Sequence, residues 1–338
     1  MQAHQSVRQA GTLVLSGADV REVLGMPQCL GAVEGAFLLL GSGRASRPVV
    51  SSVRAAEGGF HIKSALITVG DAEYFVSKTN ANYPANASKH GLPTIQGTIV
   101  VHDASNGAPL AVIDSIEITA MRTAAATAVA ARYLAREDAG SLAVIGCGVQ
   151  GFQHVRALGL VRSLRSLTLH DVDDSAARTL ASLVAEEWEF PVHISPSIGD
   201  AVRAADLIVT CTTSTEFLLH AADVQPGAFV AGVGVDAEHK RELSPELLEA
   251  SSVVVDVLEQ CAAFGDLRHA IERGVMTTAD VHAELGSIVA GDMSGRTSPE
   301  ETFVFDSTGM ALQDAATAVV VLERARANRL GVEVRFPA

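Results

Sequence analysis

Short apolar runs alternate with helical stretches through most of the second half of the chain. Six such runs, SLAVIG, SLTLHD, VHIS, DLIVTC, AFVAGVG and VVVD, lie between residues 141 and 256, and helical segments are expected near 150–161, 174–187 and 197–204. This alternation is typical of a parallel sheet covered by helices on both faces. The pattern therefore predicts a doubly wound α/β domain in this part of the chain.

The first part of the chain has a different pattern. Apolar positions between 16 and 40 fall partly at helical spacing, and Gly25 and Pro27 interrupt them, which predicts two short helices. Residues 48–101 contain stretches with strand character, separated by Gly, Asn, Pro and Lys clusters: PVVSSV, FHIKSALI, YFVSK and TIQGTIVV. We expect an irregular β-rich region there.

Longer helices are expected at two further places. The segment 119–136 is so rich in Ala and Leu that it predicts a helix, which we expect to link two domains. An amphipathic helix is expected from about Met310 to Leu330, with Gly331 in the C′ position that ends it. The segment 281–301 between them has the Gly, Ser and Pro content of a surface loop.

Composition narrows the class of protein. The 338 residues suffice for about two domains, and no apolar run approaches the roughly 18 residues that a membrane span needs. A net charge of -14 would repel a phosphate backbone, so nucleic acid is not an expected partner. The four cysteines lie far apart and the N-terminal stretch lacks the apolar core of a signal peptide, so we expect a cytoplasmic protein. We also expect no metal, because no His, Cys and Asp set has ligand spacing.

A complete GxGxxG motif follows the first of the apolar runs. It reads Gly146-Cys147-Gly148-Val149-Gln150-Gly151, directly after LAVI and directly before a predicted helix. Glycines allow the tight turn and the close backbone approach of a dinucleotide, and the helix N-terminus attracts the pyrophosphate. The motif in this context predicts a dinucleotide site.

An acidic residue stands where a ribose-binding carboxylate is expected. Asp171 ends the next strand, 171 minus 146, or 25 residues, after the first glycine, which favours NAD(H) over NADP(H). A helix cap is the alternative role, given Asp173, Asp174 and Ser175 nearby, and Arg178 could pair with a phosphate. By position alone, the segment Thr210-Cys211-Thr212 after a later strand is expected to face the riboses.

Two cations in the first part of the chain suit an acidic substrate. Lys78 begins the segment KTNANYPAN, and Arg122 lies within MRTAA at the start of the Ala-rich helix. A lysine and an arginine on separate elements, each among apolar or small residues, can hold a carboxylate by charge-assisted hydrogen bonds. The alternative for Arg122 is an exposed cation on a helix surface.

Taken together, these segments resemble the ornithine cyclodeaminase/mu-crystallin family, which includes archaeal-type alanine dehydrogenase and related imino acid reductases. The similarity runs nearly end to end and rests on K(x5)PxN from Lys78, GLPT, RTAA, the GxGxQ loop, VGVD with Lys240 and Glu242-Leu243 after it, and FDSTG at 305–309.

The resemblance implies a two-domain enzyme of class α/β. Residues 1–123, completed by 310–338, would form a discontinuous α+β domain for substrate binding and dimerisation, and 124–309 would form an NAD-binding Rossmann domain. Lys78 would be the central active-site lysine, Arg122 a carboxylate ligand and Asp236 the acid or base for the amine proton, although Asp236 could instead cap a helix. The expected cofactor-binding residues are Thr94, Gly146, Gly148, Val149, Gln150, Asp171, Thr210, Cys211, Thr212, Val233 and Ser307.

The sequence departs from the family at one segment. Many relatives have an arginine followed by Met-Pro where this chain has FHIKSA, and no acidic residue of the ornithine cyclodeaminase kind lies there. On a strand, His61 and Lys63 would share a face and suit a second anionic group of the substrate. The alternative is a solvated strand face, and Arg47 or Arg54 could replace the missing arginine.

Three functions remain open on these grounds. The first is an NAD(H)-dependent amino acid dehydrogenase or imine reductase that acts on a small α-imino or α-keto acid, for which a dicarboxylic substrate is one expectation. The second is a redox-neutral ornithine cyclodeaminase that forms proline and ammonia. The third is a binding protein like mu-crystallin, which the presence of Lys78, Arg122 and Asp236 disfavours. The missing acidic residue near His61 favours the first function.

Overall fold

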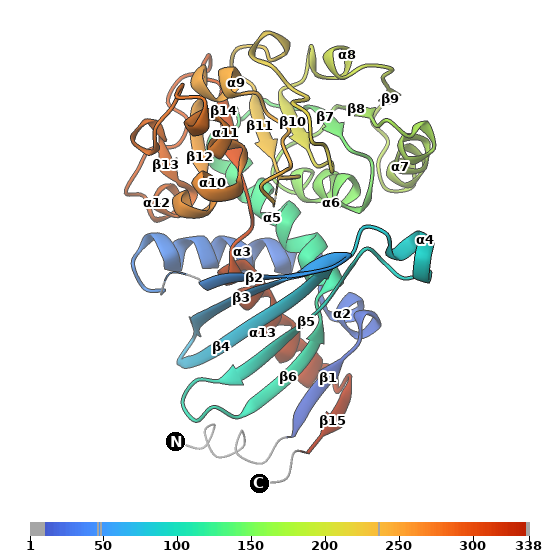
Figure 1. Ribbon diagram of the computed structural model, residues 1–338, viewed down its shortest axis with the longest axis vertical. Coiled ribbons are helices and arrows are strands. Elements are labelled where there is room, and N and C mark those ends of the chain that lie inside the picture. Colours follow the sequence, from blue (N-terminus) through green and yellow to red (C-terminus); the bar gives the residue numbers. More distant parts are fainter. Residues whose placement is uncertain (1–10, 46, 48, 236, 336–338) are drawn as a thin grey trace. The chain divides into compact units, whose positions relative to one another are not determined.

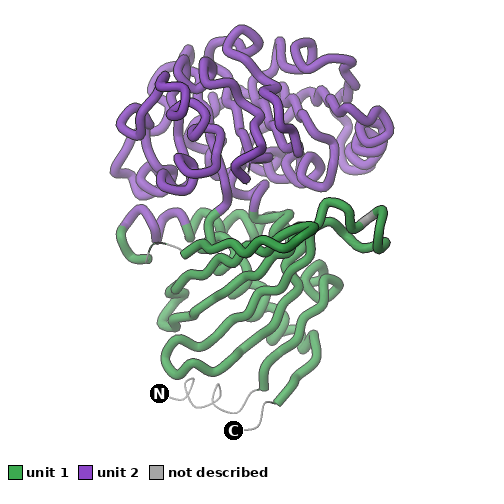
Figure 2. Tube along the Cα trace, in the orientation of Figure 1, with its two compact units in different colours: residues 1–36, 43–122, 310–338 green, residues 37–42, 123–309 purple. Residues whose placement is uncertain are grey.

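The chain divides into two compact units in a computed structural model that describes residues 11–45, 47, 49–235 and 237–335. Unit 1 comprises Met1–Ala36, Gly43–Arg122 and Met310–Ala338, and unit 2 comprises Phe37–Ser42 and Thr123–Gly309 (Figure 2). The boundary expected from the sequence lies one residue later, after 123, and no separate segment 37–42 was expected. The return to the first domain was expected at 310, where unit 1 resumes.

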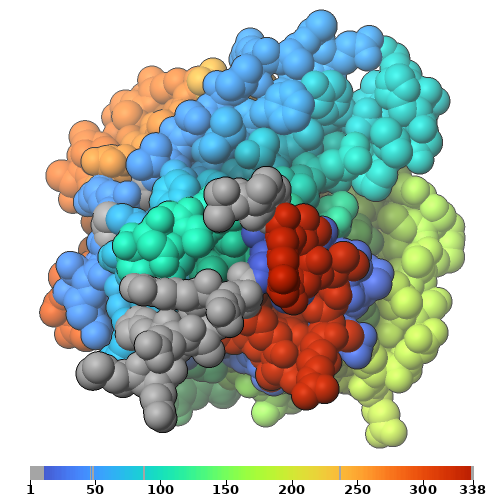
Figure 3. Space-filling model, turned by 90° about the horizontal axis from the view of Figure 1, so that it is seen from below, coloured from blue at the N-terminus to red at the C-terminus, as the bar shows by residue number. Residues whose placement is uncertain are grey.

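Unit 1 is built on a seven-stranded sheet (Figure 1). Its order is β15-β1-β6-β5-β4-β3-β2, and its described pairs are antiparallel except for β1 with β6. The strands are β1 Thr12–Leu15, β2 Val49–Ala55, β3 Gly58–Val69, β4 Ala72–Asn82, β5 Ile95–Asp103, β6 Pro109–Asp114 and β15 Val332–Val334. The C-terminal segment with β15 lies on the surface of this unit, in red in Figure 3.

The helices of unit 1 are α2 Gly17–Val23, most of α3 Met26–Gly41, α4 Asn86–His90, the start of α5 Ile116–Leu134, and α13 Ala311–Asn328. Helix α2 begins with a capping box, in which Ser16 accepts from the Asp19 N–H and the Asp19 carboxylate accepts from the Ser16 N–H. The sequence predicted two short helices here, but α3 is long, because Pro27 lies in its first turn, where proline is tolerated.

The two faces of this sheet differ in burial. One face carries buried apolar residues next to α13, among them Ala65, Ile67, Val76, Ile99 and Val101. The register between β3 and β4 runs without a break from Gly59–Asn82 to Val69–Ala72, so alternate residues of both strands share that face. The region is therefore β-rich as expected, and it is more regular than expected between β3 and β4, because their pairing continues through polar positions. Irregularity remains at the β5–β6 register shift beside Val101 and in the segment 83–94 with α4.

Unit 2 contains an eight-stranded sheet in the order β13-β12-β14-β11-β10-β7-β8-β9, with parallel pairs throughout its described residues. Its strands are β7 Ser141–Ile145, β8 Ser166–His170, β9 Val192–Ile194, β10 Leu207–Thr210, β11 Phe229–Gly232, β12 Ser252–Val255, β13 Ala283–Glu284 and β14 Phe303–Asp306. Its helices besides the rest of α5 are α6 Val149–Leu158, α7 Asp174–Glu187, α8 Ile198–Val202, α9 Pro245–Glu249, α10 Leu258–Phe264, α11 Asp266–Glu272 and α12 Leu285–Ala290, with 3₁₀ turns at Ala221–Asp223 and Thr278–Asp280.

This sheet is the doubly wound fold that the alternating pattern predicted. The chain winds outward from β7 through β8 to β9 and then returns to place β10 on the other side of β7. Strand order therefore reverses between β7 and β10, and α/β sheets bind ligands at the carboxyl ends of the strands beside such a reversal. Buried aliphatic side chains such as Ile208, Val230, Val253 and Val304 form part of the core around the sheet.

Two local expectations were wrong. The segment 281–301, expected as a surface loop, begins with β13 and α12, because Leu285 and Ile288 are buried among the Gly and Ser residues. Helix α13 ends with Arg329 as its left-handed cap, at φ 58°, and not with Gly331, which has its own positive φ of 88° two residues later. A non-glycine residue in this conformation is uncommon, so residue type alone did not indicate it.

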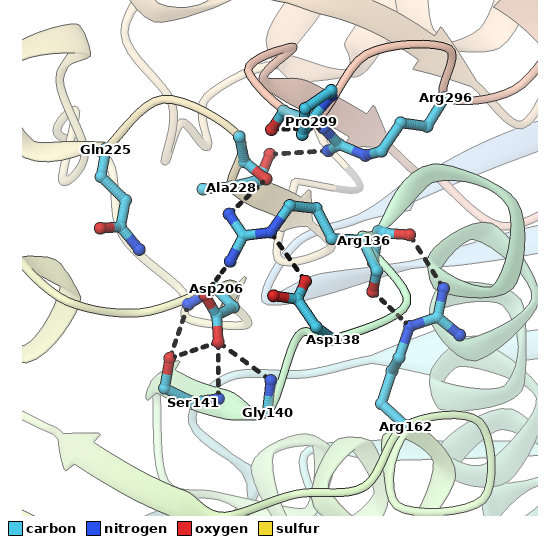
Figure 4. Close-up of polar contacts among 12 residues, drawn as sticks. Arg136, Asp138, Gly140, Ser141, Arg162, Asp206, Gln225, Ala228, Arg296 and Pro299 are labelled. Atoms are coloured by element: carbon cyan, nitrogen blue, oxygen red, sulfur yellow. Dashed lines mark hydrogen bonds and ion pairs between the residues drawn. The ribbon is translucent and has the colours of Figure 1, made fainter.

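Arginine side chains stabilise the amino-terminal edge of the unit 2 sheet. Asp206, just before β10, accepts hydrogen bonds from the Gly140 and Ser141 N–H groups and from Arg136 Nη2 at 2.6 Å (Figure 4). Arg162 donates to carbonyl oxygens at the end of α5, which satisfies groups that a helix leaves unpaired. These arginine and aspartate side chains make their hydrogen bonds with one another and with the backbone, which indicates a structural role.

None of the described helices alone has both the length and the apolar character needed to cross a membrane; α2 and α3, bent by 89° at their junction, pass that test only as a pair.

Candidate active site

The glycine loop lies between β7 and α6, and each glycine meets a different need. Gly146 has φ +103°, and a Cβ there would lie 2.8 Å from the Cys211 carbonyl oxygen. A Cβ on Gly151 would lie 2.5 Å from the Gly146 carbonyl oxygen, so this glycine allows the helix to pack closely on the strand. A Cβ on Gly148, the N-cap of α6, would meet no described heavy atom within 4 Å. The open space at Gly148 leads to the first turn of α6, where a pyrophosphate can bind.

Asp171 follows β8 and is held against this loop. Its Oδ2 accepts a hydrogen bond from the Cys147 N–H at 2.7 Å, and its Oδ1 accepts one from the Asp173 N–H at 2.9 Å. The cap of α7 is Asp173, whose side chain accepts from the Ser175 N–H. The helix-cap alternative therefore applies to Asp173, and ribose binding by Asp171 stays a prediction. Arg178 pairs with Asp174 on the surface.

A buried carboxylate that the sequence analysis did not assign a role, Glu242, joins the loops after β10 and β11. Its Oε2 accepts from the Thr210 hydroxyl and the Gly234 N–H, both at 2.9 Å, and its Oε1 accepts from the Thr212 N–H at 2.5 Å. Burial raises the pKa of Glu242, and these donors act in the opposite direction. The Thr210 hydroxyl is therefore fully buried on Glu242, and its predicted place beside a ribose stays a prediction.

The other predicted cofactor residues of unit 2 follow strands at the same, carboxyl, edge of the sheet. Ser307 donates to Asp256 Oδ2 at 3.0 Å, and the Cys211 thiol donates to the Gly146 carbonyl oxygen at 3.1 Å. Val149, the first residue of α6, is 68% exposed. The parallel strands place these residues at one edge: Gly146, Gly148, Val149 and Gln150 after β7, Asp171 after β8, Cys211 and Thr212 after β10, Val233 after β11, and Ser307 after β14.

In unit 1, a buried ion cluster surrounds Lys78. Lys78 lies on β4 with only 3% of its side chain exposed, and its Nζ donates to Asp314 Oδ1 at 2.8 Å and to the Thr119 hydroxyl at 3.2 Å. Burial lowers the pKa of Lys78 to about 7; Arg122 and Lys63 act in the same direction, and Asp314 opposes them. The amine therefore titrates near neutral pH, which suits a group that handles charge or protons in a reaction.

Arg122 joins the same cluster from α5. Its Nε donates to Asp314 Oδ1 at 3.0 Å and its Nη1 to Gln313 Oε1 at 3.0 Å, with 8% of the side chain exposed. The surface-cation alternative for Arg122 is therefore wrong. The structure brings Lys78 and Arg122 together on one carboxylate oxygen.

Asp314 and Gln313, on the first turn of α13, were missed by the sequence analysis. Asp314 lies 236 residues after Lys78, so no local motif connects them. A signal was present, because Asp314 shares its helix stripe with Ala318, Val321 and Ala325, all of them buried. A single acid in an apolar stripe indicates a buried charge that needs a partner.

His61 and Lys63 lie on the same sheet face as Lys78. Lys63 is the direct cross-strand neighbour of Lys78, and His61 is the neighbour of Asn80. His61 Nδ1 is 3.0 Å from the Ser52 hydroxyl, and Lys63 is close enough to Lys78 and Asp314 to influence the pKa of each. Arg54 pairs with Gly59 on this face but is exposed. This face of unit 1 carries positive charge beside the buried cluster.

Thr94, Arg47 and Asp236 are three other predicted site residues. Thr94 is exposed just before β5, and its carbonyl oxygen accepts from the Tyr83 N–H at 2.9 Å. Arg47 is exposed before β2. Asp236 lies outside the described residues, so its predicted acid or base role is retained as a hypothesis only.

Comparisons with known proteins agree across the chain. The profile described as ornithine cyclodeaminase/mu-crystallin family matches residues 10–329. Among solved structures, an archaeal alanine dehydrogenase, described as a dimer with bound NAD, is 34% identical over 96% of this chain and 99% of its own, with a TM-score of 0.92.

Two further solved structures are similar over nearly their whole length. Thermococcus litoralis Δ1-pyrroline-2-carboxylate reductase, in complex with NADH and L-proline, is 31% identical over 96% of this chain and 100% of its own, with a TM-score of 0.90. Paracoccus denitrificans iminosuccinate reductase, in complex with NAD+, is 28% identical over the same shares, with a TM-score of 0.87.

Proposed function

Because the chain belongs to the ornithine cyclodeaminase/mu-crystallin family, we propose that it is an NAD(H)-dependent oxidoreductase that interconverts an α-amino acid with its α-imino acid, or with the α-keto acid and an amine. The observation that carries this proposal is the buried pair of cations, Lys78 and Arg122, that share one carboxylate oxygen of Asp314 in unit 1. Such a pair, held in place and largely removed from water, is suited to bind the carboxylate that every amino, imino and keto acid has.

Unit 2 supports the choice of cofactor. The open approach at Gly148, the first turn of α6 and the Asp171 carboxylate fit the pyrophosphate and ribose of NAD(H). NAD(H), when bound there, supplies or accepts the hydride at the substrate's α-carbon.

The chain's own residues have two tasks in this reaction. Lys78 and Arg122 bind the carboxylate and so orient the α-carbon and its nitrogen. The nitrogen must gain a proton on reduction and lose one on oxidation, and we assign this transfer to Asp236, as the family resemblance implies. Lys78, with a pKa near neutrality, carries positive charge below pH 7 and gives it up above.

We further propose a small dicarboxylic substrate. Lys63 and His61 lie beside Lys78 on the same sheet face, so a second carboxylate would find a cation, Lys63, and a hydrogen-bonding imidazole, His61, there. An ornithine ammonium group would instead be repelled by Lys63. The charge pattern therefore favours net oxidation or reduction over ornithine cyclodeamination.

A homodimer is the assembly that we propose. The sheet face of unit 1 opposite Lys78 carries exposed apolar side chains in register, among them Val49 at 64%, Val53 at 55%, Phe60 at 37%, Leu66 at 39% and Phe75 at 38%. Exposed apolar side chains gathered on one sheet face in this way are typical of an interface. A second copy of the chain is the occupant we assign to it, in line with the dimer reported for the archaeal relative.

The direct test is an assay of the purified protein that follows NADH absorbance. Pyruvate, oxaloacetate, 2-oxoglutarate and glyoxylate would each be offered with ammonia or methylamine, and ornithine would be tested separately for ammonia release. We expect net NADH oxidation, fastest with a dicarboxylic keto acid. Steady formation of proline from ornithine with no net change in NADH would instead establish the cyclodeaminase and refute this proposal.

A further inference from the structure

We propose that Asp314 is a positioning residue for the reaction: it holds Lys78 and Arg122 side by side as one receptor for the substrate carboxylate and keeps Lys78 charged inside the protein. This inference rests on the proposed function, because it assigns a role within the same site. Asp314 is not part of the motifs on which the family resemblance rests.

The geometry of the cluster supports this role. A single oxygen, Asp314 Oδ1, accepts a hydrogen bond from each cation: from Lys78 Nζ at 2.8 Å and from Arg122 Nε at 3.0 Å. The two cations come from different elements, β4 and α5, and α13 supplies the carboxylate between them. Gln313, the preceding residue of α13, adds a second contact to the guanidinium through its Oε1. One helix turn therefore fixes the spacing of both cations.

Two buried atoms indicate that this arrangement does more than stabilise the fold. Asp314 Oδ2 and Gln313 Nε2 are buried and have no hydrogen-bond partner among the described residues. A carboxylate that served only to pair an arginine would engage it through both oxygens, which is the stronger geometry. Here Oδ1 is shared between two cations while Oδ2 is unused, an arrangement in which each cation keeps N–H donors for a substrate.

The charges around Lys78 give Asp314 a second role, which is to keep Lys78 protonated. Three charged groups act on Lys78 from the elements around it: Lys63 on β3, Arg122 on α5 and Asp314 on α13. Cys29 on α3 lies near Arg122 and Asp314. Burial raises the pKa of the Cys29 thiol to about 12, so it stays neutral. Asp314 is thus the single anion among these groups, and it faces two cations, Lys63 and Arg122, besides Lys78 itself. Without Asp314, burial and repulsion would drive the proton off Lys78.

We do not expect Asp314 to contact the substrate itself. A carboxylate in direct contact with the substrate's own carboxylate would repel it, whereas a carboxylate behind the two cations orients their free donors. We therefore expect its loss to weaken substrate binding chiefly through Lys78.

The test compares wild type with Asp314→Asn, which keeps the shape and removes the charge, and with Asp314→Glu, which keeps the charge. The pH dependence of kcat/KM would be measured with the best keto acid substrate, together with NADH affinity as a check of folding. A second readout is independent of turnover. The chain has only four lysines, Lys63, Lys78, Lys89 and Lys240, so ¹³C-labelled lysine gives few NMR signals, and loss of one in Lys78→Met identifies Lys78.

In Asp314→Asn we expect Lys78 to lose its proton at a pH lower by roughly one unit or more. The pH above which kcat/KM falls should move down by the same amount. KM for the keto acid should rise about tenfold or more while NADH affinity is retained. Asp314→Glu should keep the wild-type pH limit despite a lower rate. An unchanged Lys78 titration and pH limit in a folded Asp314→Asn would overturn the inference. Inactivity of the wild type on every acid would refute the proposed function instead, and the NMR titration would still decide the role of Asp314.

Discussion

Lys78 shows how much of the site depends on single residues and their surroundings. Motif spacing predicted Lys78 and Arg122, because each lies in a recognisable local segment, but it could not predict that both donate to one oxygen of Asp314. The same limit applies to Glu242, whose three hydrogen bonds join loops that follow different strands. Residue identity is local information, whereas the partner of a buried charge is set by tertiary packing.

Lys63 tests the proposed substrate class at this scale. Lys63→Met should lower kcat/KM for oxaloacetate with ammonia by roughly 10- to 100-fold, because a charge-assisted contact of about 1.5–3 kcal/mol is lost. Pyruvate, which has no second carboxylate, should be much less affected. Lys89→Met is the matched control, since Lys89 is an exposed residue of α4 that pairs with Glu57. Equal losses of kcat/KM for both acids would show that Lys63 does not bind the second carboxylate.

Gly148 tests the cofactor site without disturbing the fold. Its backbone lies at φ -80°, which alanine can adopt, and an added Cβ meets no described atom within 4 Å. Gly148→Ala should therefore keep the wild-type thermal stability and lower NADH affinity about tenfold or more, by obstructing the pyrophosphate. Gly35→Ala, in α3, is a control with equally open space. Unchanged NADH affinity in a folded Gly148→Ala would argue against pyrophosphate binding there.

At the scale of elements, local pattern predicted the helices and strands of unit 2 closely, because each carries its own period and its own cap. Helix α7 begins and ends where it was expected, with Asp173 as its cap. The prediction was wrong where tertiary packing decides whether a helix forms. Helix α12 has the Gly and Ser content of a loop, but its Leu285 and Ile288 are buried in the core.

A buried histidine between α5 and α6 should make the stability of the protein depend on pH. His154, on α6, is fully buried, with Nδ1 2.8 Å from the Gln150 carbonyl oxygen and Nε2 3.0 Å from the Thr127 hydroxyl of α5. Burial lowers the pKa of His154 to about 4, below the roughly 6.5 of an unfolded histidine. The unfolded state therefore binds more protons between these values, so the stability that neutral His154 contributes is present above pH 6.5 and is lost as pH falls toward 4.

Chemical unfolding of wild type and His154→Gln across this pH range measures the effect. The difference in their free energies of unfolding should shrink by about 3 kcal/mol from about pH 6.5 to about pH 4, because glutamine does not titrate. Subtracting the two curves removes the contribution of every other group. A difference that stays constant with pH would mean that His154 is not held neutral in the folded protein.

For the whole molecule, the family and the two-unit, mixed α/β organisation were predicted from sequence and are confirmed. These features follow from patterns spread over hundreds of residues, which single local errors do not change. The substrate could not be predicted to the same depth, because relatives with the same fold act on different amino and imino acids and specificity depends on few side chains.

The proposed dimer is tested by a charge placed on the uncovered sheet face. Leu66→Glu should convert a dimer to a monomer in sedimentation or light scattering, because a buried unpaired carboxylate at an interface is costly. Leu183→Glu on α7 is a matched control, since both leucines are 39% exposed. A dimer that survives Leu66→Glu would show that this face is not the contact.

The transfer of hydride to the α-carbon is the central claim, and isotope labelling tests it most directly. The protein would be incubated with ammonia, a keto acid and NADH that carries deuterium at the transferred position, and the amino acid formed would be analysed by mass spectrometry. We predict an amino acid with deuterium at the α-carbon, formed in step with NADH oxidation, and none with Lys78→Met. An unlabelled amino acid would contradict this claim, as would proline formed in a parallel incubation with ornithine while the NADH is unchanged.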